Sequence, residues 1–183
     1  MGLIYKGIHQ AVALKLRDEM NLRVLVETGT YKGDTVKWAI DKFDKVISMD
    51  ISHEFVDRVA KDIKANNVLL IHGDSRERLA PVCRGRHNEP TLFWLDAHWT
   101  GEKEYKDPLG MCPLLEEVTA INDNFFGAHA IMIDDYSLWV KPLLDKLKVL
   151  LCDKGRSERD IAVTDDIVIA CRHMPRAFLG YLI

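Results

Sequence analysis

Short apolar runs that alternate with amphipathic segments are the feature of this sequence that most restricts its fold. Each run is rich in β-branched residues, too short for a helix and mostly apolar throughout, which is typical of parallel strands covered on both faces. The runs span residues 23–27, 45–50, 68–72, 92–96 and 130–134. Helical patterns occupy residues 10–20, 35–43, 54–65, 113–125 and 142–151. This alternation predicts an α/β fold: a doubly wound, mostly parallel sheet with helices on both faces.

The C-terminal part of the sequence predicts a different strand arrangement. Residues 161–164 and 167–171 are separated only by Asp165-Asp166, a pattern that indicates an antiparallel hairpin closing one edge of a seven-stranded sheet. The helix at residues 10–20 is expected to pack across a sheet edge, and Asp34 is expected to cap the helix that follows it. With 183 residues, no internal repeat and no low-complexity segment, residues 1–183 are expected to form a single domain.

Composition and charge exclude several classes of partner. The 25 Lys and Arg residues against 28 Asp and Glu give a net charge of −3, which offers no electrostatic reason to expect a nucleic-acid partner. No apolar run reaches the ~18 residues that a membrane-spanning helix needs, so no membrane partner is expected. The four cysteines are widely separated and form no CxxC motif, which favours reduced thiols and a cytoplasmic protein.

Glycines and acids follow the first three predicted strands. The first strand ends in Glu27-Thr28-Gly29-Thr30-Tyr31, with Gly33 two residues later, and two glycines at a strand-to-helix turn let the backbone approach a ligand closely. The second strand ends in Asp50, followed by Ile51, and the third is followed by Asp74 and Ser75. Each signal alone also fits a turn or a helix cap. The glycine spacing differs from that of the GxGxxG dinucleotide motif, which argues against a nicotinamide enzyme.

Together, the segments ETGTYKG, MD and GDS resemble the class I S-adenosylmethionine (SAM)-dependent methyltransferases, and the resemblance extends from residue 22 to residue 171. It implies a Rossmann-like fold in which Gly29 and its neighbours pass under the methionine moiety. It also implies that Asp50 binds the ribose diol, with Ile51 beside it, and that Asp74 and Ser75 contact the adenine. Glu27 would orient the loop or the amino group of the cofactor. Tyr31 stands where the commonest form of the family motif has another glycine.

Acids also follow the fourth and fifth predicted strands. The segments LFWLDAHW and IMIDDYSLW place Asp96, Asp134 and Asp135 at the carboxyl edge of the sheet, where ligands bind in doubly wound folds. Three converging carboxylates repel one another unless they are neutralised, and oxygen-rich sites suit Mg²⁺. In the alternative interpretation, Asp134 and Asp135 cap the next helix while Asp96 accepts hydrogen bonds from backbone amides.

This half of the chain is similar to the metal-dependent O-methyltransferases of the macrocin and catechol type. The similarity implies that Asp96, Asp134 and Asp135 hold Mg²⁺ or another divalent cation. His98 follows the first of these acids and is a candidate catalytic residue with Asp96, because an imidazole can accept a hydroxyl proton at neutral pH. His98 could equally be a metal or substrate ligand, or a structural residue.

Aromatic residues accompany the two acidic motifs. Trp99, Tyr105, Tyr136 and Trp139 are candidate substrate-binding residues, because aromatic faces at a polar rim suit sugar rings or flat aromatic groups. Trp139 could equally be a core residue. Residues 97–111 carry no periodic pattern, and a connection this long beyond a strand end is typical of a functional loop.

These observations predict a SAM-dependent O-methyltransferase, assisted by a divalent metal, that acts on a hydroxyl of a sugar-containing or other small polyhydroxylated metabolite. Two alternatives remain: a metal-independent methyltransferase with His98 as the base, and a catalytically inactive nucleoside-binding module. A domain of this size leaves no room for a separate substrate domain, so the acceptor is expected to be held by the loop after Asp96, by the N-terminal helix or by a neighbouring protomer, and the last of these predicts a homodimer.

Overall fold

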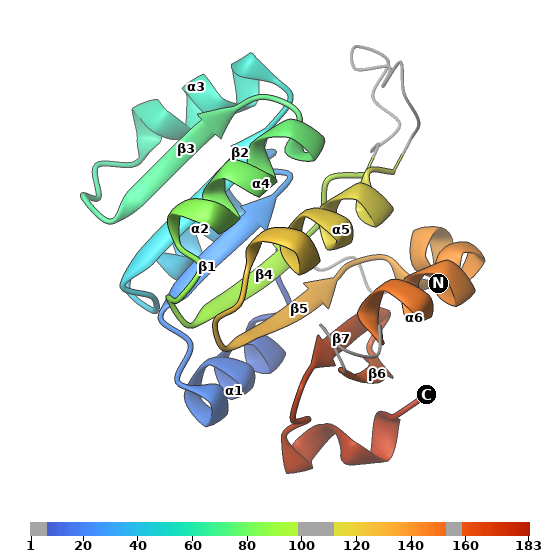
Figure 1. The fold of residues 1–183 in the computed structure, drawn as a ribbon. Helices are drawn as coiled ribbons and strands as arrows, with labels where there is room; N and C mark the ends of the chain where they lie inside the picture. Colours follow the sequence, from blue (N-terminus) through green and yellow to red (C-terminus); the bar gives the residue numbers. More distant parts are fainter. Residues whose placement is uncertain (1–6, 99–111, 153–158) are drawn as a thin grey trace.

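The computed structural model describes residues 7–98, 112–152 and 159–183, which form a seven-stranded sheet flanked by helices (Figure 1). The strand order is β3-β2-β1-β4-β5-β7-β6, and β7 runs antiparallel to both of its neighbours, β5 and β6, while the other pairs are parallel. The strands are β1 (Val24–Thr28), β2 (Lys45–Asp50), β3 (Val68–His72), β4 (Thr91–Leu95), β5 (His129–Ile133), β6 (Asp160–Thr164) and β7 (Ile167–Cys171). The predicted doubly wound sheet with a C-terminal antiparallel hairpin is therefore confirmed.

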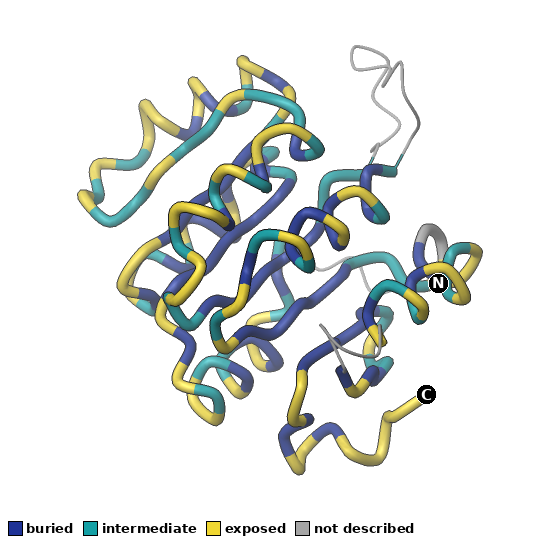
Figure 2. Tube along the Cα trace, in the orientation of Figure 1, coloured by how far each residue is buried: buried dark blue, intermediate teal, exposed yellow. Residues whose placement is uncertain are grey.

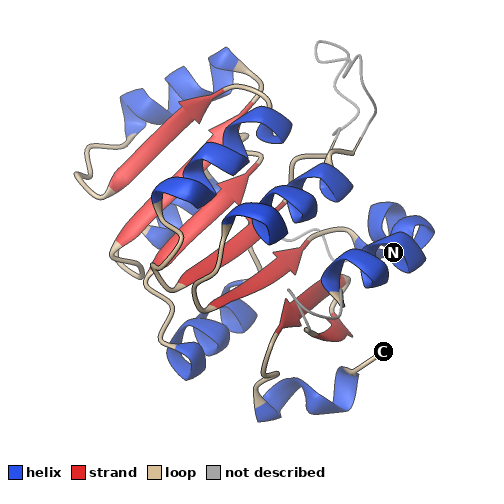
Figure 3. Ribbon diagram, in the orientation of Figure 1, coloured by secondary structure: helices blue, strands red, loops and turns tan. Residues whose placement is uncertain are grey.

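Helices cover both faces of the sheet (Figure 3). The longer elements are α1 (Gln10–Met20), α2 (Asp34–Ala39), α3 (His53–Asp62), α4 (Ser75–Gly85), α5 (Leu114–Asn124) and α6 (Leu144–Leu151). Three further helical segments are not α-helical: η1 (Tyr136–Val140), η2 (Lys141–Leu143) and η3 (Arg176–Tyr181). Local capping explains two of the helix starts: Ser52 accepts a hydrogen bond from the backbone of Phe55 at α3, and Asp74 accepts one from Arg76 at α4.

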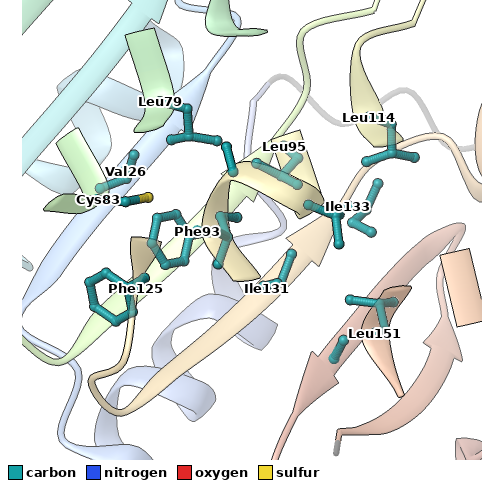
Figure 4. Packing of buried hydrophobic residues seen from close by; sticks show 14 of the residues in the cluster. Val26, Leu79, Cys83, Phe93, Leu95, Leu114, Phe125, Ile131, Ile133 and Leu151 are labelled. Atoms are coloured by element: carbon teal, nitrogen blue, oxygen red, sulfur yellow. The ribbon is translucent and has the colours of Figure 1, made fainter. Parts of the chain in front are cut away.

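Two apolar layers sandwich the sheet. Side chains of α4, α5 and α6 pack on one face, and side chains of α1, α2 and η3 pack on the other. Figure 4 shows the first layer, with labelled members Val26, Leu79, Cys83, Phe93, Leu95, Leu114, Phe125, Ile131, Ile133 and Leu151. Strands β1, β4, β5 and β7 are buried along their whole length, as Figure 2 shows, and this burial explains why they are mostly apolar in sequence.

Three expectations need correction. The predicted strand at residues 68–72 is present, but it is the last strand at one edge of the sheet. It is therefore only partly buried, and Leu69 and His72 are exposed. The first helix lies across the sheet centre instead of an edge: Ala13 and Leu16 are fully buried in the apolar layer that covers β4 and β5. The second helix ends at Ala39, and its N-cap is Gly33, so Asp34 is its first residue.

Within the described ranges, no helix combines the length and the apolar character that crossing a membrane requires.

Candidate functional site

The strand ends that carry the predicted site residues lie in one row. Thr28 pairs in register with Met49 and with Leu95, Met49 pairs with Ile71, and Leu95 pairs with Ile133. The residues that follow these positions share the carboxyl edge of the sheet: Gly29, Asp50, His72, Asp96 and Asp134. The register therefore brings together the candidates that the sequence distributes over about a hundred residues.

The glycine loop between β1 and α2 is built around left-handed backbone conformations. Gly29 has φ 88° and Gly33 has φ 76°, values that side-chain-bearing residues rarely adopt. A Cβ on Gly29 would lie 2.5 Å from the carbonyl oxygen of Asp96, so the loop packs directly against the backbone that follows β4. Tyr31, which occupies the position of the missing third glycine, also has a positive φ of 45°. The chain thus keeps a glycine-like turn at Tyr31.

Asp50 organises this loop. One of its carboxylate oxygens accepts a hydrogen bond from the backbone N–H of Tyr31 at 2.8 Å, and the other accepts one from that of Ser52 at 2.8 Å. Burial raises the pKa of Asp50, and the two amides oppose that shift. Each carboxylate oxygen can accept a second hydrogen bond, so Asp50 retains capacity for the hydroxyl donors of a ribose. The neighbouring Ile51 is half exposed.

Glu27 lies beneath the loop and is only 2% exposed. Its carboxyl oxygen accepts a hydrogen bond from the Ser48 hydroxyl at 2.5 Å, and Ser48 also shares a 2.6 Å hydrogen bond with Thr30. Burial raises the pKa of Glu27 to about 8, so the carboxyl is predominantly neutral at pH 7. Glu27 therefore orients the glycine loop through Ser48 and Thr30. Sequence reasoning identified Glu27 and Thr30 but missed Ser48, which lies inside a buried strand.

Asp74 and Ser75 lie at the start of α4. Asp74 caps the helix and pairs with the Arg76 guanidinium, with an Nη2–Oδ2 distance of 2.7 Å. The capping alternative from the sequence is thus realised for Asp74, while its contact with an adenine stays a prediction. Ser75 is buried.

His98 joins the acids that follow β4 and β5. Its Nε2 lies 2.7 Å from Oδ2 of Asp135, and its Nδ1 lies 3.4 Å from Oδ1 of Asp96. The hydrogen bond with His98 lowers the pKa of Asp135, so this carboxylate is ionised and can only accept. The Nε2 atom of His98 therefore carries the hydrogen, and in the neutral ring the lone pair is on Nδ1.

The pKa values of the other two carboxyls, Asp96 and Asp134, are raised, in contrast to that of Asp135. Burial, followed by the charge of Asp134, raises the pKa of Asp96 well above its usual range. Burial likewise raises the pKa of Asp134 to about 6. The alternative role of Asp134 as a helix cap is not what the structure shows, because its Oδ1 accepts from the backbone of Asp135 instead. A cationic ligand would favour the ionised form of both carboxyls, so the site suits a cation.

The structure does not show the predicted cation site. Within residues 7–98, 112–152 and 159–183, no three His, Cys, Asp or Glu side chains are placed to hold a metal ion. Of the predicted ligands, Asp135 accepts a hydrogen bond from His98 at its Oδ2, and the His98 ring lies between Asp135 and Asp96. The three carboxyls do gather at one edge, as predicted, but the imidazole is their shared neighbour.

The predicted substrate residues are only partly placed. Tyr136 is half buried and opens η1, directly after Asp135. Trp139 lies within η1, although its side chain is outside the described part of the structure. Trp99 and Tyr105 lie outside the described residues, as does most of the loop at residues 97–111.

Glu117 is a buried acid that sequence reasoning missed. It lies on the apolar face of α5 at 1% exposure, where Ser75 and Thr28 donate hydrogen bonds to its carboxyl. Burial nevertheless raises its pKa to about 7, and its charge contributes to the raised pKa of Asp96. The signal was present in the sequence, since Glu117 falls within the helical stripe formed by Leu114, Val118 and Ile121.

Comparisons with known proteins identify the fold. No known family model and no curated protein matches the chain by sequence. A Staphylococcus aureus protein assigned as a caffeoyl-CoA O-methyltransferase superposes with a TM-score of 0.62 and 13% identity, over 94% of this chain and 86% of that one. A Streptococcus mutans protein assigned as a methyltransferase, in complex with S-adenosylhomocysteine (SAH), superposes with a TM-score of 0.60 and 11% identity, over 91% of this chain and 99% of that one.

An rRNA methylase from Streptococcus thermophilus gives a TM-score of 0.55 and 17% identity, over 94% of this chain and 100% of that one. A SAM-dependent methyltransferase from Archaeoglobus fulgidus superposes over 91% of this chain, with a TM-score of 0.55 and 15% identity. Such low identities establish the fold alone. This chain therefore has the Rossmann-like fold of SAM-dependent methyltransferases.

Proposed function

We propose that this protein is a SAM-dependent O-methyltransferase in which His98 removes the proton of the acceptor hydroxyl and Asp135 orients His98. The observation that carries the proposal is the His98–Asp135 pair, with its 2.7 Å hydrogen bond, at the same sheet edge as the glycine loop. The fold and the close packing of Gly29 against the backbone of Asp96 support a shared cofactor and acceptor site.

The residues of the glycine loop fit the proposed cofactor. Asp50 has acceptor capacity for a ribose diol, and the loop turns through left-handed backbone conformations at Gly29, Tyr31 and Gly33. The crowded carboxyls of Asp96 and Asp134 complement a sulfonium cation, whose positive charge would favour their ionised form. When bound, SAM supplies a methyl group activated for transfer to an oxygen nucleophile.

The chain's own residues then have defined tasks. His98 Nδ1 accepts the acceptor proton, while the Nε2–H of His98 stays hydrogen-bonded to Asp135, which stabilises the resulting imidazolium. As this O–H bond breaks, a bond forms between the acceptor oxygen and the methyl carbon, and the sulfur–carbon bond breaks to leave a neutral thioether. The products are a methyl ether and S-adenosylhomocysteine (SAH).

The acceptor class rests on the sequence. We propose a small hydroxylated metabolite, such as a sugar-containing or polyhydroxylated compound, because the net charge of −3 disfavours a polyanionic acceptor. A single domain, a cytoplasmic location and a second copy of the chain that helps to hold the acceptor belong to the same proposal.

The test combines binding with turnover. Calorimetric titration with SAH should show saturable binding, and labelled methyl groups should pass from SAM to a hydroxyl in a panel that includes catechol and methyl glucoside. His98→Gln should reduce turnover by roughly 100-fold or more while the SAH Kd changes less than about threefold. His173→Gln, a change at an exposed histidine after β7, is the matched control and should keep wild-type turnover.

Two results would overturn parts of this proposal. Absence of SAH binding would reject the methyltransferase assignment, and wild-type turnover by His98→Gln would reject His98 as the base. Metal assistance is the second candidate, favoured by the crowding of Asp96 and Asp134. Turnover that falls with EDTA and returns with Mg²⁺ would establish it, whereas turnover that is unchanged in EDTA would support the metal-independent reaction.

A further inference from the structure

The backbone of Asp135 has a conformation that its neighbours must stabilise. Its φ of 51° and ψ of 52° lie in the left-handed region, which is unfavourable for a side-chain-bearing residue. This conformation immediately precedes η1 and accompanies the 2.7 Å contact between Asp135 and His98. A residue that holds the segment after Asp135 would therefore influence where the imidazole lies.

One residue from the distant β6–β7 turn makes three hydrogen bonds to that segment. The backbone oxygen of Asp166 accepts from the N–H of Tyr136 at 2.7 Å. The Oδ1 atom of Asp166 accepts from the backbone N–H of Ser137 at 2.8 Å and from the Ser137 hydroxyl at 2.5 Å. Both residues that follow Asp135 are thus attached to a single residue about thirty positions further along the chain.

The sheet explains why this turn is in reach. Ile133, the last residue of β5, pairs with Val168 of β7, so the hairpin turn lies beside the carboxyl end of β5 (Figure 1). Asp165 and Asp166 both have positive φ, at 49° and 64°, as a tight two-residue hairpin turn requires. Asp165 points to a different partner, with its Oδ2 3.4 Å from Nε2 of His9.

We propose that Asp166 is a positioning residue for the proposed methyl transfer: its contacts to Tyr136 and Ser137 hold Asp135 in the conformation that orients His98. This inference rests on the proposed function. It extends the active site to the C-terminal hairpin, an element in which neither strand carries a predicted site residue. Asp166 touches no reacting atom in this scheme: it acts through Asp135, and its charge also contributes to the raised pKa of Asp134.

The variants separate the role of the side chain from that of the turn. Asp166→Gly retains the left-handed turn but removes both Oδ1 contacts, whereas Asp166→Asn retains a carbonyl oxygen that can accept from Ser137. Asp165→Gly is the matched control, because it changes the adjacent turn residue without touching residues 135–137. Ser137→Ala removes only the hydroxyl donor and provides a second route if Asp166→Gly does not fold.

The primary readout is the ¹⁵N spectrum of the histidine side chains in the SAH-bound protein, with the His98 signals assigned by their loss in His98→Gln. Asp166→Gly should shift the His98 signals away from the Nε2-protonated pattern, while Asp166→Asn and Asp165→Gly should retain it. Ser137→Ala should produce a smaller shift in the same direction. On an acceptor that the wild type methylates, Asp166→Gly should lower kcat by about tenfold with an unchanged SAH Kd, and Asp166→Asn should restore it to within about threefold.

Wild-type His98 signals in both Asp166→Gly and Ser137→Ala would overturn the positioning role. The positioning role would also be overturned if Asp165→Gly shifted the His98 signals as much as Asp166→Gly does, because the effect would then belong to the hairpin as a whole. Failure of the proposed function has a separate signature, since a wild-type protein that does not bind SAH would reject it without any variant.

Discussion

Two buried polar clusters lie at opposite ends of the same sheet and differ in how their charges are balanced. The acidic cluster, at the carboxyl ends of β1, β4 and β5, contains Glu27, Asp96, Asp134 and Glu117. The basic cluster, at the amino ends of β5 and β6, contains His129 and Arg159 with the amide of Asn122. Burial shifts pKa values in both, upward for the acids and downward for the bases, because it disfavours the charged form in each case.

The basic cluster is closed by its own hydrogen bonds. The Nδ1–H of His129 donates to the carbonyl of Gly127 at 2.7 Å, and its Nε2 accepts from Arg159 Nη2 at 2.6 Å. Arg159 also donates to the Asn122 side chain at 2.9 Å. These contacts fix one neutral tautomer of His129, whose pKa burial lowers to about 4. Hydrogen bonds among its own side chains thus link α5, β5 and β6.

The acidic cluster lacks this closure. The raised pKa values of Asp96 and Asp134 result from burial together with the mutual repulsion of the carboxyls, and the imidazole of His98 lies beside Asp96. A bound cation would favour the ionised form of these carboxyls. The comparison teaches that burial perturbs both clusters, whereas the crowding of several acids at the ligand-binding edge of the sheet distinguishes the candidate site.

The largest expected effect on stability comes from neutralising Glu27. Its folded pKa of about 8 exceeds the ordinary 4.5, so its contribution to stability is complete below pH 4.5 and is lost as the pH rises through 8. Glu27→Gln, which imitates the neutral acid, should raise the free energy of unfolding of the ligand-free protein above pH 8 by on the order of 4 kcal/mol relative to the wild type. Urea unfolding at pH 5 and pH 9 measures the difference, with Glu19→Gln at an exposed position of α1 as the control. Parallel pH dependence of wild type and Glu27→Gln would contradict it.

The basic cluster should respond to the opposite end of the pH range. The folded pKa of His129, about 4, lies below the ordinary 6.5, so the unfolded chain binds more protons in between and stability falls as the pH drops from 6.5 to 4. His129 accounts for roughly 3 kcal/mol of this loss. His129→Gln keeps an acceptor for Arg159 but cannot titrate, so its stability deficit relative to the wild type should shrink towards pH 4. A deficit that stays constant from pH 7 to pH 4 in urea unfolding would refute this assignment.

A surface ion pair provides the smallest effect and shows why burial matters. Arg23 and Asp44 lie 2.8 Å apart, nearly as close as His98 and Asp135, but both side chains are well exposed. Asp44→Asn should change the free energy of unfolding by less than about 0.5 kcal/mol, since water and salt screen such pairs. Thermal melting in low and high salt is sufficient to measure it. A loss comparable to that of the buried groups would mean that charge pairing, and not desolvation, dominates in this protein.

Much of the fold could be predicted from the sequence, and the errors have physical causes. Contiguous apolar runs predicted the strands, because a strand that is buried on both faces needs apolar side chains along its whole length. Residues 68–72 have the same composition as the central strands, so periodicity could not show that β3 is an edge. The position of α1 over β4 and β5 depends on the order of strands, which no local pattern encodes.

The candidate site divides in the same way. Gly29, Gly33 and Asp50 were identified because turns that need positive φ and strand-end acids leave short-range signatures. Ser48 and Glu117 were missed because their roles depend on contacts with other elements. Ser48 contacts Glu27 of β1, and Glu117 contacts Thr28 of the same strand and Ser75 of α4. The sequence correctly indicated that Asp96, Asp134 and Asp135 gather at one edge, but it could not show that the His98 ring lies between Asp96 and Asp135.

The sequence by itself therefore determined which segments form strands, where the glycine turn falls and that acids collect at one edge, since these follow from side-chain periodicity and backbone preference over a few residues. Only the tertiary structure decided that His98 hydrogen-bonds to Asp135 and that the β6–β7 turn holds the segment after Asp135. Those contacts join residues about thirty or more positions apart. Their geometry is set by strand register and by the burial of the surrounding core, quantities that exist only when the whole sheet has assembled.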